Sequence, residues 1–373
     1  MQISALKENF NNENRVALTP DTIKLFQRLG LEVLIEDGAG NNSGYPNDLY
    51  EANGAKIASR DQCLKANICL CVKIPNDNDL QQLNENTVLI GILNPYENKK
   101  YFNTLNEKKI ISCCMELIPR ISRAQSMDVL SSQANLAGYR SVIDAAEQFG
   151  KAFPMMMTAA GRVNPAKVMV LGVGVAGLQA IATAKRLGAV VSATDVRSAT
   201  KEQVESLGGK FIMVEDEESS NAETEGGYAK EMSEEYKQKQ AKLIAETIAK
   251  QDIVICTALI PGKKAPVLIS QEMVESMASG SVVVDLAVEA GGNCPLSKEG
   301  EVVDHGGVKI VGYANVPGRV AKDASALYAK NIFNFLSLII NKDDKKINFN
   351  WEDEIVNAVT LTHEGKLRLE QFN

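Results

Sequence analysis

Three glycines with the spacing Gly172-x-Gly174-x-x-Gly177 stand between an apolar run and a helical stretch. In such a turn the first glycine permits a sharp bend, the second lets the backbone approach a pyrophosphate, and the third lets helix and strand pack closely. The helix N-terminus adds unpaired N–H groups that attract phosphate charge. This order of strand, turn and helix predicts a dinucleotide site. Its backbone runs over Gly172, Gly174, Val175, Ala176 and Gly177.

A second predicted strand ends at Asp195, 18 positions beyond Gly177. A carboxylate at this distance accepts hydrogen bonds from the ribose 2′-OH of NAD(H) and repels the 2′-phosphate of NADP(H). Arg197 works against this preference, because a nearby Arg can accommodate that phosphate. With Asp195 in place, we expect NAD(H) at this site.

A hydride donor also needs partners at its nicotinamide ring. The segment 119–135 holds a dense set of amide, hydroxyl and charged groups at a predicted domain junction. An Arg and an Asp from this segment could hold a carboxamide by its oxygen and its nitrogen. The alternative is a capped loop with a surface ion pair, and the residue types leave both interpretations open.

The chain offers few candidates for a catalytic base. Oxidation of an alcohol or an amine releases a proton together with a hydride, so such a dehydrogenase needs a positioned base. Hydride transfer between two nicotinamide rings needs only positioning and electrostatics. Of the two histidines, His305 lies in a glycine turn and His363 lies near the terminus. The sequence shows no Ser-His-Asp constellation and no metal-ligand cluster, so we expect no metal site. Seven cysteines, mostly in apolar runs, indicate buried reduced thiols.

Apolar, β-branched runs alternate with helical patterns, which predicts α/β architecture with mainly parallel sheets. We expect two doubly wound Rossmann-like domains, the first over 1–130 completed by 320–373 and the second over 131–319. Long helices over 131–150 and 324–340 would link them beside a ligand cleft. A helix over 20–29 would be capped by Thr19. The predicted strands cover 2–6, 31–36, 66–73, 87–92 and 109–114, then 168–172, 189–195, 211–214, 252–258, 281–287 and 308–313.

The acidic segment 215–240 interrupts this alternation and is longer than an ordinary connection. Its composition fits a solvated loop. The alternative is a mobile lid, with Gly226 and Gly227 as the hinge and Tyr228 closing over a cofactor.

Composition excludes several classes of partner. A net charge of −7 and a pI near 5.2 argue against nucleic acid. The apolar stretch 332–340 falls short of the roughly 20 residues that span a bilayer. The N-terminus shows no signal pattern. We therefore expect a cytoplasmic chain without a transmembrane segment.

Over nearly its whole length the chain resembles the NAD(H)-binding alpha subunit (domain I) of proton-translocating NAD(P)+ transhydrogenase, a family related to alanine dehydrogenase. The stretch 119–140 carries the resemblance most specifically. The other motifs are N-R-V-A-L-T-P at 14–20, the glycine turn, T-D-V-R at 194–197, G-G-Y-A-K at 226–230, T-A-L-I-P-G at 257–262 and V-D-L-A at 284–287.

The resemblance implies a role for each matching residue. Arg120, Asp128 and Ser131 would orient NADH, and Gln125 would face an NADP(H)-binding subunit. Tyr228 would close on bound nucleotide. The cofactor contacts outside the glycine turn would be Asp195, Val196, Arg197, Ala258 and Leu259.

The resemblance also implies the assembly. The family works as a homodimer together with a membrane-spanning, proton-conducting subunit or domain and a separate NADP(H)-binding subunit. The implied reaction is direct, Si/Re-specific hydride transfer from NADH to NADP+, coupled to proton translocation, which regenerates NADPH. The chain would be active only with these partners, on the cytoplasmic face of the inner membrane.

Two other functions stay open. Arg15 and Lys73 sit where alanine dehydrogenase, the relative, binds its keto-acid substrate. The catalytic histidine of that relative should fall near residues 93–95, where this chain has Leu-Asn-Pro. The absence of that histidine favours transhydrogenase and leaves Arg15 and Lys73 as structural remnants. The third possibility is a non-catalytic NAD sensor.

Overall fold

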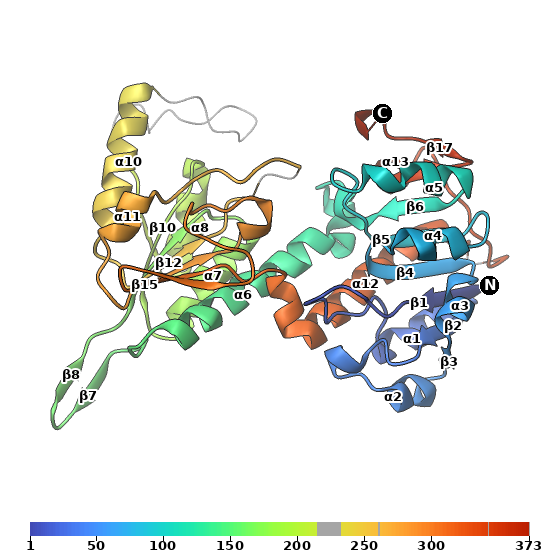
Figure 1. Cartoon of the computed structure of the whole chain (residues 1–373), viewed down its shortest axis with the longest axis horizontal. Helices are drawn as coiled ribbons and strands as arrows, with labels where there is room; N and C mark the ends of the chain where they lie inside the picture. Colours follow the sequence, from blue (N-terminus) through green and yellow to red (C-terminus); the bar gives the residue numbers. More distant parts are fainter. Residues whose placement is uncertain (215–232, 260–261, 342, 373) are drawn as a thin grey trace. The chain divides into compact units, whose positions relative to one another are not determined.

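The computed structural model describes residues 1–214, 233–259, 262–341 and 343–372, which fold into two compact units (Figure 1). The first unit comprises Met1–Gln133 with Pro317–Asn373, and the second comprises Ala134–Val316. The sequence predicted boundaries after residues 130 and 319. Helix α6 (Val129–Gln148) contains the first boundary. Helix α12 (Ala321–Ile339), predicted as the second linking helix, starts beyond the second boundary and belongs to the first unit.

The sheet of the first unit has the strand order β17-β16-β6-β5-β4-β1-β2-β3. Strands β1 to β6 are parallel, and their order 3-2-1-4-5-6 is that of a doubly wound sheet. The C-terminal tail, for which the sequence predicted no element, supplies β16 and β17 as antiparallel neighbours. The strands are β1 (Gln2–Ala5), β2 (Glu32–Glu36), β3 (Lys56–Ala58), β4 (Ile68–Lys73), β5 (Val88–Ile92), β6 (Ile111–Cys114), β16 (Thr360–His363) and β17 (Lys366–Leu367).

Both faces of this sheet are buried. Alternate residues of β4 belong to different hydrophobic cores, with Ile68 and Leu70 on one side and Cys69 and Cys71 on the other. Burial on both faces explains why the parallel strands read as continuous apolar runs. One core includes residues of α1 (Pro20–Arg28), α12 and α13 (Glu354–Val359), and the other includes residues of α3 (Arg60–Leu64), α4 (Asp77–Gln82) and α5 (Phe102–Glu107). Helix α2 (Asn47–Ala52) precedes β3.

The start of α1 agrees with the prediction in position. Thr19 is the N-cap residue and forms a capping box with Thr22, the third residue of the helix. Thr22 Oγ1 accepts the Thr19 N–H at 3.3 Å and donates to the Thr19 carbonyl at 2.8 Å. The side chain of Thr22 therefore makes the strongest contacts of this cap, because Oγ1 of Thr19 is buried without a hydrogen-bond partner.

The second unit repeats the doubly wound order, β11-β10-β9-β12-β13-β15-β14. All neighbours are parallel except β14, an unpredicted edge strand that ends at His305. A separate, unpredicted hairpin, β7 (Met156–Thr158) with β8 (Gly161–Val163), projects from this unit (Figure 1). The other strands are β9 (Lys167–Leu171), β10 (Val190–Thr194), β11 (Lys210–Phe211), β12 (Ile253–Cys256), β13 (Val282–Asp285), β14 (Val302–His305) and β15 (Val308–Val311).

Helices cover both faces of this second sheet as well. On β9, Val168 and Val170 belong to one core, and Met169 and Leu171 belong to another. The first core includes residues of α6, α7 (Val175–Arg186) and α8 (Lys201–Ser206), and the second includes residues of α10 (Glu234–Ile248) and α11 (Gln271–Glu275).

Most of the predicted lid, including Tyr228, lies outside the described residues. The described part of the predicted loop, 233–240, is helical: Ser233 caps α10 by accepting the Tyr236 N–H at 3.1 Å. Within the part of the chain that the structure describes, no helix combines the length and the apolar character needed to cross a membrane.

Candidate functional site

The strand order places a switch point at β9, which has β10 on one side and β12 on the other. Connections leave the two sides of such a strand toward opposite faces of the sheet, and the crevice between them is where doubly wound sheets bind ligands. Here that position lies between the glycine turn and the loop after β12. The two loops touch: Thr257 Oγ1 donates to the Gly172 carbonyl at 2.9 Å.

The conformation of the glycine turn requires two of its three glycines. Gly172 has a positive φ of +96°, which L side chains rarely adopt. A Cβ at Gly177 would lie 1.9 Å from the Gly172 carbonyl oxygen, so this helix and strand approach too closely for any other residue. Gly174 is different, because among the described residues no atom beyond its chain neighbours lies within 4 Å of its Cβ position. Its backbone therefore faces open space just before α7 begins, where a phosphate can approach the N–H groups.

Helix α7 begins at Val175, so Val175 and Ala176 form its first turn. Helix α6 packs directly on this turn. A Cβ at Gly138 would lie 2.1 Å from the Ala176 carbonyl oxygen, and Asn135 Nδ2 donates to Gln179 Oε1 at 3.4 Å. Helix α6 thus supports the glycine turn, a role that its sequence did not indicate.

Asp195 directly follows β10, but protein donors already surround its carboxylate. Oδ2 accepts the Val173 N–H at 2.7 Å and Nη2 of Arg197 at 3.1 Å. Oδ1 accepts both the backbone N–H and Nε of Arg197 at 2.9 Å. An ionised carboxylate has about four acceptor positions. A ribose hydroxyl would therefore have to replace part of the contact with Arg197, whose side chain is 45% exposed. The neighbouring Val196 is 87% exposed.

The charge state of Asp195 follows from these bonds. Burial raises the pKa of its carboxyl, but hydrogen bonds from Arg197 and from the Val173 N–H outweigh this effect and hold the pKa below its ordinary value. Asp195 is thus ionised at neutral pH. It ties the glycine turn to the end of β10 and keeps negative charge beside the turn.

The loop after β12 carries Ala258 and Leu259, the other predicted cofactor contacts. Leu259 is 54% exposed. Both backbone polar groups of Ala258 bond to the side chain of Asn293, which accepts the Ala258 N–H at 3.1 Å and donates to the Ala258 carbonyl at 2.9 Å. Sequence reasoning missed Asn293 and Thr257. The pair Gly291-Gly292, directly before Asn293, was the available signal for a special turn.

The predicted nicotinamide loop belongs to the first unit and forms a 3-10 helix, Ser122–Met127, before α6. Arg120 and Gln125 are exposed. Asp128 and Ser131 bond to each other: Oδ1 accepts the Ser131 N–H at 2.9 Å and Oδ2 accepts its hydroxyl at 2.6 Å. This is a helix cap, so the capped-loop reading describes the geometry of Asp128.

Two further contacts hold this loop against the C-terminal segment. Arg123 makes a bidentate ion pair with Asp353, at 2.7 and 3.0 Å. Asn331 and Asn334 of α12 both donate to the Ser126 carbonyl, at 2.8 and 2.9 Å. The surface ion pair of the alternative reading is therefore present as well. These anchors leave the exposed Gln125 at the tip of a well-held loop.

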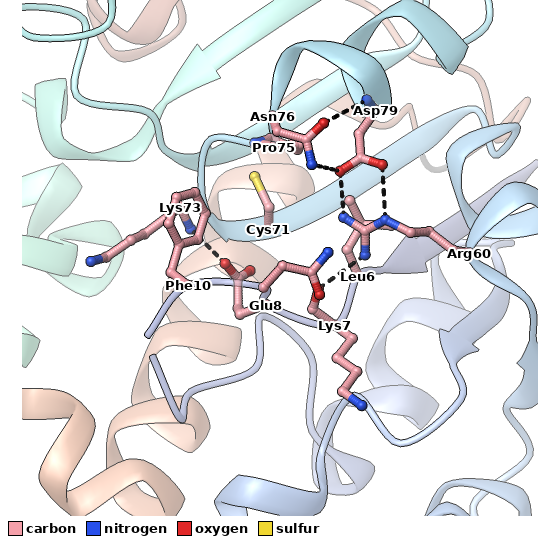
Figure 2. Close-up of a pocket in the computed structure, with 11 residues that line it drawn as sticks. Leu6, Lys7, Glu8, Phe10, Arg60, Cys71, Lys73, Pro75, Asn76 and Asp79 are labelled. Carbon is pink, nitrogen blue, oxygen red and sulfur yellow. Dashed lines mark hydrogen bonds and ion pairs between the residues drawn. The ribbon is translucent and has the colours of Figure 1, made fainter. Parts of the chain in front are cut away.

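The first unit has a crevice of its own, at the carboxyl ends of β1 and β4 (Figure 2). Glu8 accepts the backbone N–H groups of Val72 and Lys73, at 2.6 and 3.2 Å. Burial raises the pKa of Glu8 to about 8. The Nζ of Lys73 lies 5.6 Å from the centre of the Phe10 ring. The crevice is lined by Leu6, Lys7, Glu8, Asn9, Phe10, Arg60, Cys71, Lys73, Pro75, Asn76 and Asp79.

Arg15 is buried and bonded within the first unit. Its Nε and Nη2 donate to Glu13 at 2.8 and 2.7 Å, and Nη1 donates to Gln133 at 2.8 Å. Where a catalytic histidine would fall, the structure has Asn94, whose backbone N–H bonds to Glu116. Burial raises the pKa of Glu116 to about 7. The hydrogen bonds of Arg15 to Glu13 and Gln133 are those of a structural residue.

The two histidines do not line the crevice of the first unit. His305 pairs with Glu275 at 3.1 Å, and the ring of His363 lies 4.7 Å from that of Trp351. All seven cysteines are buried, and burial raises the pKa of Cys69 and Cys113 to about 12. Among the described residues, no three His, Cys, Asp or Glu side chains gather in a group that could hold a metal ion.

Two family profiles match the chain. The profile for the N-terminal domain of alanine dehydrogenase/PNT matches residues 4–137, and the profile for its C-terminal domain matches residues 141–370. The chain belongs to the alanine dehydrogenase/PNT family. The predicted family is therefore confirmed.

The chain is more similar to transhydrogenase relatives than to alanine dehydrogenase relatives of this family. The chain is similar to the first part of NAD(P) transhydrogenase subunit alpha of Rhodospirillum rubrum, with 55% identity over 98% of this chain and 97% of the relative. The crystal structure of transhydrogenase from Sinorhizobium meliloti superposes with a TM-score of 0.90 at 50% identity, over 98% of this chain and 100% of that one. Alanine dehydrogenase 1 of Staphylococcus aureus (strain Mu50) is 30% identical, over 92% of this chain and 88% of the relative. The chain is thus a transhydrogenase alpha-subunit homologue, and the predicted two-domain Rossmann-like fold is confirmed.

Proposed function

We propose that this chain binds NAD(H) on its second unit and donates hydride directly to NADP+ held by a partner subunit, while a membrane partner couples the transfer to proton translocation. The observation that carries the proposal is the glycine turn at the β9 switch point, with open space at Gly174 and the ionised Asp195 beside it. The 55% identity to a transhydrogenase alpha subunit over almost the full length supports the same reading.

The residues of the second unit fit a dinucleotide. The turn from Gly172 to Gly177 presents backbone N–H groups to a pyrophosphate, with α7 behind it. Asp195 accepts hydrogen bonds from the ribose hydroxyls after some of its hydrogen bonds from Arg197 break. A carboxylate at this position favours NAD(H) over NADP(H). Val196, Ala258 and Leu259 line the two sides of the crevice. Bound NADH supplies the hydride, and transfer to a second nicotinamide requires no base from this chain.

The loop of the first unit supplies the second element of the proposal. Arg120, Asp128 and Ser131 orient the nicotinamide end of NADH, and Gln125 faces the NADP(H)-binding subunit. In support, Gln125 is exposed on a loop that is anchored on both sides. Asp128 and Ser131 bond to each other, so they would act on the nucleotide as a unit. Tyr228, proposed to close over the nucleotide, lies outside the described residues.

The assembly belongs to the same proposal. We infer that the chain works as a homodimer, with a proton-conducting membrane subunit and an NADP(H)-binding subunit. It would lie at the cytoplasmic face of the inner membrane through these partners. The name of the Rhodospirillum rubrum relative designates only the first part of an alpha subunit, which supports a divided assembly of this kind.

The test mixes the purified chain with an NADP(H)-binding partner subunit and follows hydride transfer from NADPH to an NAD+ analogue with a distinct absorbance. Transfer that requires both proteins is expected. Gln125→Ala and Arg120→Ala should slow transfer far more than they weaken NADH binding, since their proposed roles arise after binding. Tight NADH binding without transfer would instead identify a sensor, and the proposed reaction would be wrong.

A second candidate, an alanine dehydrogenase-like activity, rests on the crevice of the first unit. Lys73 lies there beside Glu8 and Phe10 (Figure 2). Asn94 in place of a histidine, and the engagement of Arg15 with Glu13, speak against this activity. Formation of NADH from NAD+ and alanine by the isolated chain would establish it.

A further inference from the structure

Asn293 is a fully buried polar residue at the edge of the proposed NAD(H) site. Its side chain makes three hydrogen bonds. Oδ1 accepts the Ala258 N–H at 3.1 Å, and Nδ2 donates to the carbonyls of Ala258 at 2.9 Å and Pro266 at 2.7 Å. The amide thus has a protein partner for both of its hydrogens and for its oxygen.

These bonds hold both ends of one loop. Ala258 lies two residues beyond β12, and Pro266 lies where the chain returns toward α11. The main-chain carbonyl of Asn293 adds two more contacts, accepting the N–H groups of Leu268 and Ile269 at 2.8 and 3.1 Å. One side chain and one carbonyl of Asn293 therefore hold Ala258 together with the segment from Pro266 to Ile269.

A special turn places Asn293 in this position. Gly291 and Gly292 have positive φ values of +95° and +79°, a conformation that L side chains rarely adopt. The buried carboxylate of Asp285 accepts the N–H of the next residue, Cys294, at 3.0 Å and the hydroxyl of Ser297 at 2.6 Å. The turn is thus rigid at the point from which the amide projects, and rigid supporting residues determine how well a site keeps its geometry.

We infer that Asn293 is a positioning residue for NAD(H): by occupying the N–H and carbonyl of Ala258, it sets the distance between the loop after β12 and the glycine turn, and so the width of the crevice. Thr257, next to Ala258, bonds to Gly172 from the same loop. Displacement of Ala258 would therefore reach the glycine turn directly. This inference rests on the proposed function, because it needs the β9 crevice to hold the nucleotide.

The experiment compares Asn293→Ala and Asn293→Asp with the wild-type chain. The aspartate keeps the acceptor for the Ala258 N–H but loses both donors and faces two carbonyl oxygens. Each variant should weaken NADH binding by about tenfold, as expected for the loss of buried hydrogen bonds. The transfer rate at saturating NADH, measured with the NADP(H)-binding partner, should stay within about twofold, since the residue acts on binding geometry rather than on the transfer step.

Ser297→Ala is the matched control, because it removes a buried hydrogen bond from the same turn without touching Ala258. It should lower the melting temperature as the Asn293 variants do and leave NADH affinity unchanged. Hydrogen exchange at the Ala258 amide provides a second measurement, which should accelerate only in Asn293→Ala.

Three outcomes overturn the inference. Equal loss of NADH affinity in Ser297→Ala and the Asn293 variants would reduce Asn293 to a general stabilising residue. Unchanged affinity in both Asn293 variants, with Asp195→Ala still weakening binding, would refute the inference and leave the proposed function standing. A wild-type chain that binds no NADH would remove the proposed function and the inference together. If Asn293→Ala fails to fold, affinity and exchange in Asn293→Asp decide, with faster exchange then expected at Leu268 and Ile269.

Discussion

The six parallel strands of the two units follow the same order, and in each unit one acidic side chain accepts a backbone N–H from the loop after the central strand. In the first unit Glu36, at the end of β2, accepts the Lys7 N–H at 2.7 Å. In the second, Asp195, just after β10, accepts the Val173 N–H at 2.7 Å. In each unit an acid beside the switch point thus ties down the loop that follows the central strand. The acid alone does not distinguish a nucleotide site from a structural tie.

The loops after the central strands differ completely. After β1 the chain places Glu8 over the end of β4, where its carboxylate accepts the N–H groups of Val72 and Lys73. The first unit therefore supplies its own hydrogen-bond acceptor to these backbone donors. After β9 the second unit has the glycine turn at the corresponding position, and among the described residues no atom beyond the chain neighbours lies within 4 Å of a Cβ built at Gly174. The glycine turn, rather than the acid, therefore distinguishes the second unit from the first.

The largest expected change in NADH affinity comes from adding a methyl group to Gly177 in the glycine turn. In Gly177→Ala the added Cβ would overlap the Gly172 carbonyl, so the turn must shift. Overpacking of this kind should weaken NADH binding by about tenfold to a hundredfold, as measured by calorimetric titration. Gly150→Ala is the control, because no atom lies within 4 Å of that Cβ position. Unchanged affinity in Gly177→Ala would show that the nucleotide binds elsewhere.

The next test compares Asp195 with Glu36, the acid at the equivalent position of the first unit. Asp195→Ala and Glu36→Ala each leave a backbone N–H without its acceptor, so both should lower the melting temperature. Only Asp195→Ala should weaken NADH binding, by about tenfold for the loss of charge-assisted hydrogen bonds to the ribose. Equal loss of affinity in the two variants would mean that Asp195 is only a structural tie, like Glu36.

A smaller effect is expected at Gly174. The methyl group of its alanine variant would lie more than 4 Å from every described atom beyond the chain neighbours, so the melting temperature should not change. The new methyl group would still face the approaching pyrophosphate and should weaken NADH binding several-fold. Titration together with thermal unfolding separates the two quantities. A lower melting temperature without a change in affinity would contradict the proposed position of the phosphate.

The smallest effect concerns Glu8, the buried acid of the first unit. Burial raises the pKa of Glu8 from 4.5 to about 8, so its contribution to stability is complete below about pH 4.5 and is lost as the pH rises through about 8. Glu8→Gln cannot ionise. Its melting temperature relative to wild type should therefore increase from acidic pH up to about pH 8 and then level off. A difference that is independent of pH would show that Glu8 is ionised throughout this range.

Much of this fold could be predicted because its signals are local. The apolar runs of the parallel strands are continuous because both sheet faces are buried, and the glycine turn is legible because backbone conformation restricts residue type. Strands β3, β14 and β16 were missed, since each is short or lies toward an edge of its sheet. Thr19 is the N-cap residue that the sequence predicted, but the bonds from Thr22 to its backbone were not predicted.

In the candidate site, too, the sequence indicated some residues and missed others. The sequence indicated Gly172, Gly174, Gly177 and Asp195 by spacing, because one strand–turn–helix unit and the next strand bring them together. It did not indicate Asn293, because its partner Ala258 lies 35 residues away in the chain and a lone Asn has no characteristic pattern.

By itself, then, the sequence determined where the chain bends sharply, which helix N-terminus can bind an anion and which family motifs are present. These features depend on residues that are neighbours in the chain. Only the tertiary structure decided from which donors each acidic side chain accepts its hydrogen bonds. Asp195 bonds to Val173 and Arg197, and Glu8 bonds to backbone 64 residues away. A buried carboxylate or amide must find hydrogen-bond partners, and folding, rather than sequence proximity, determines which groups are within reach.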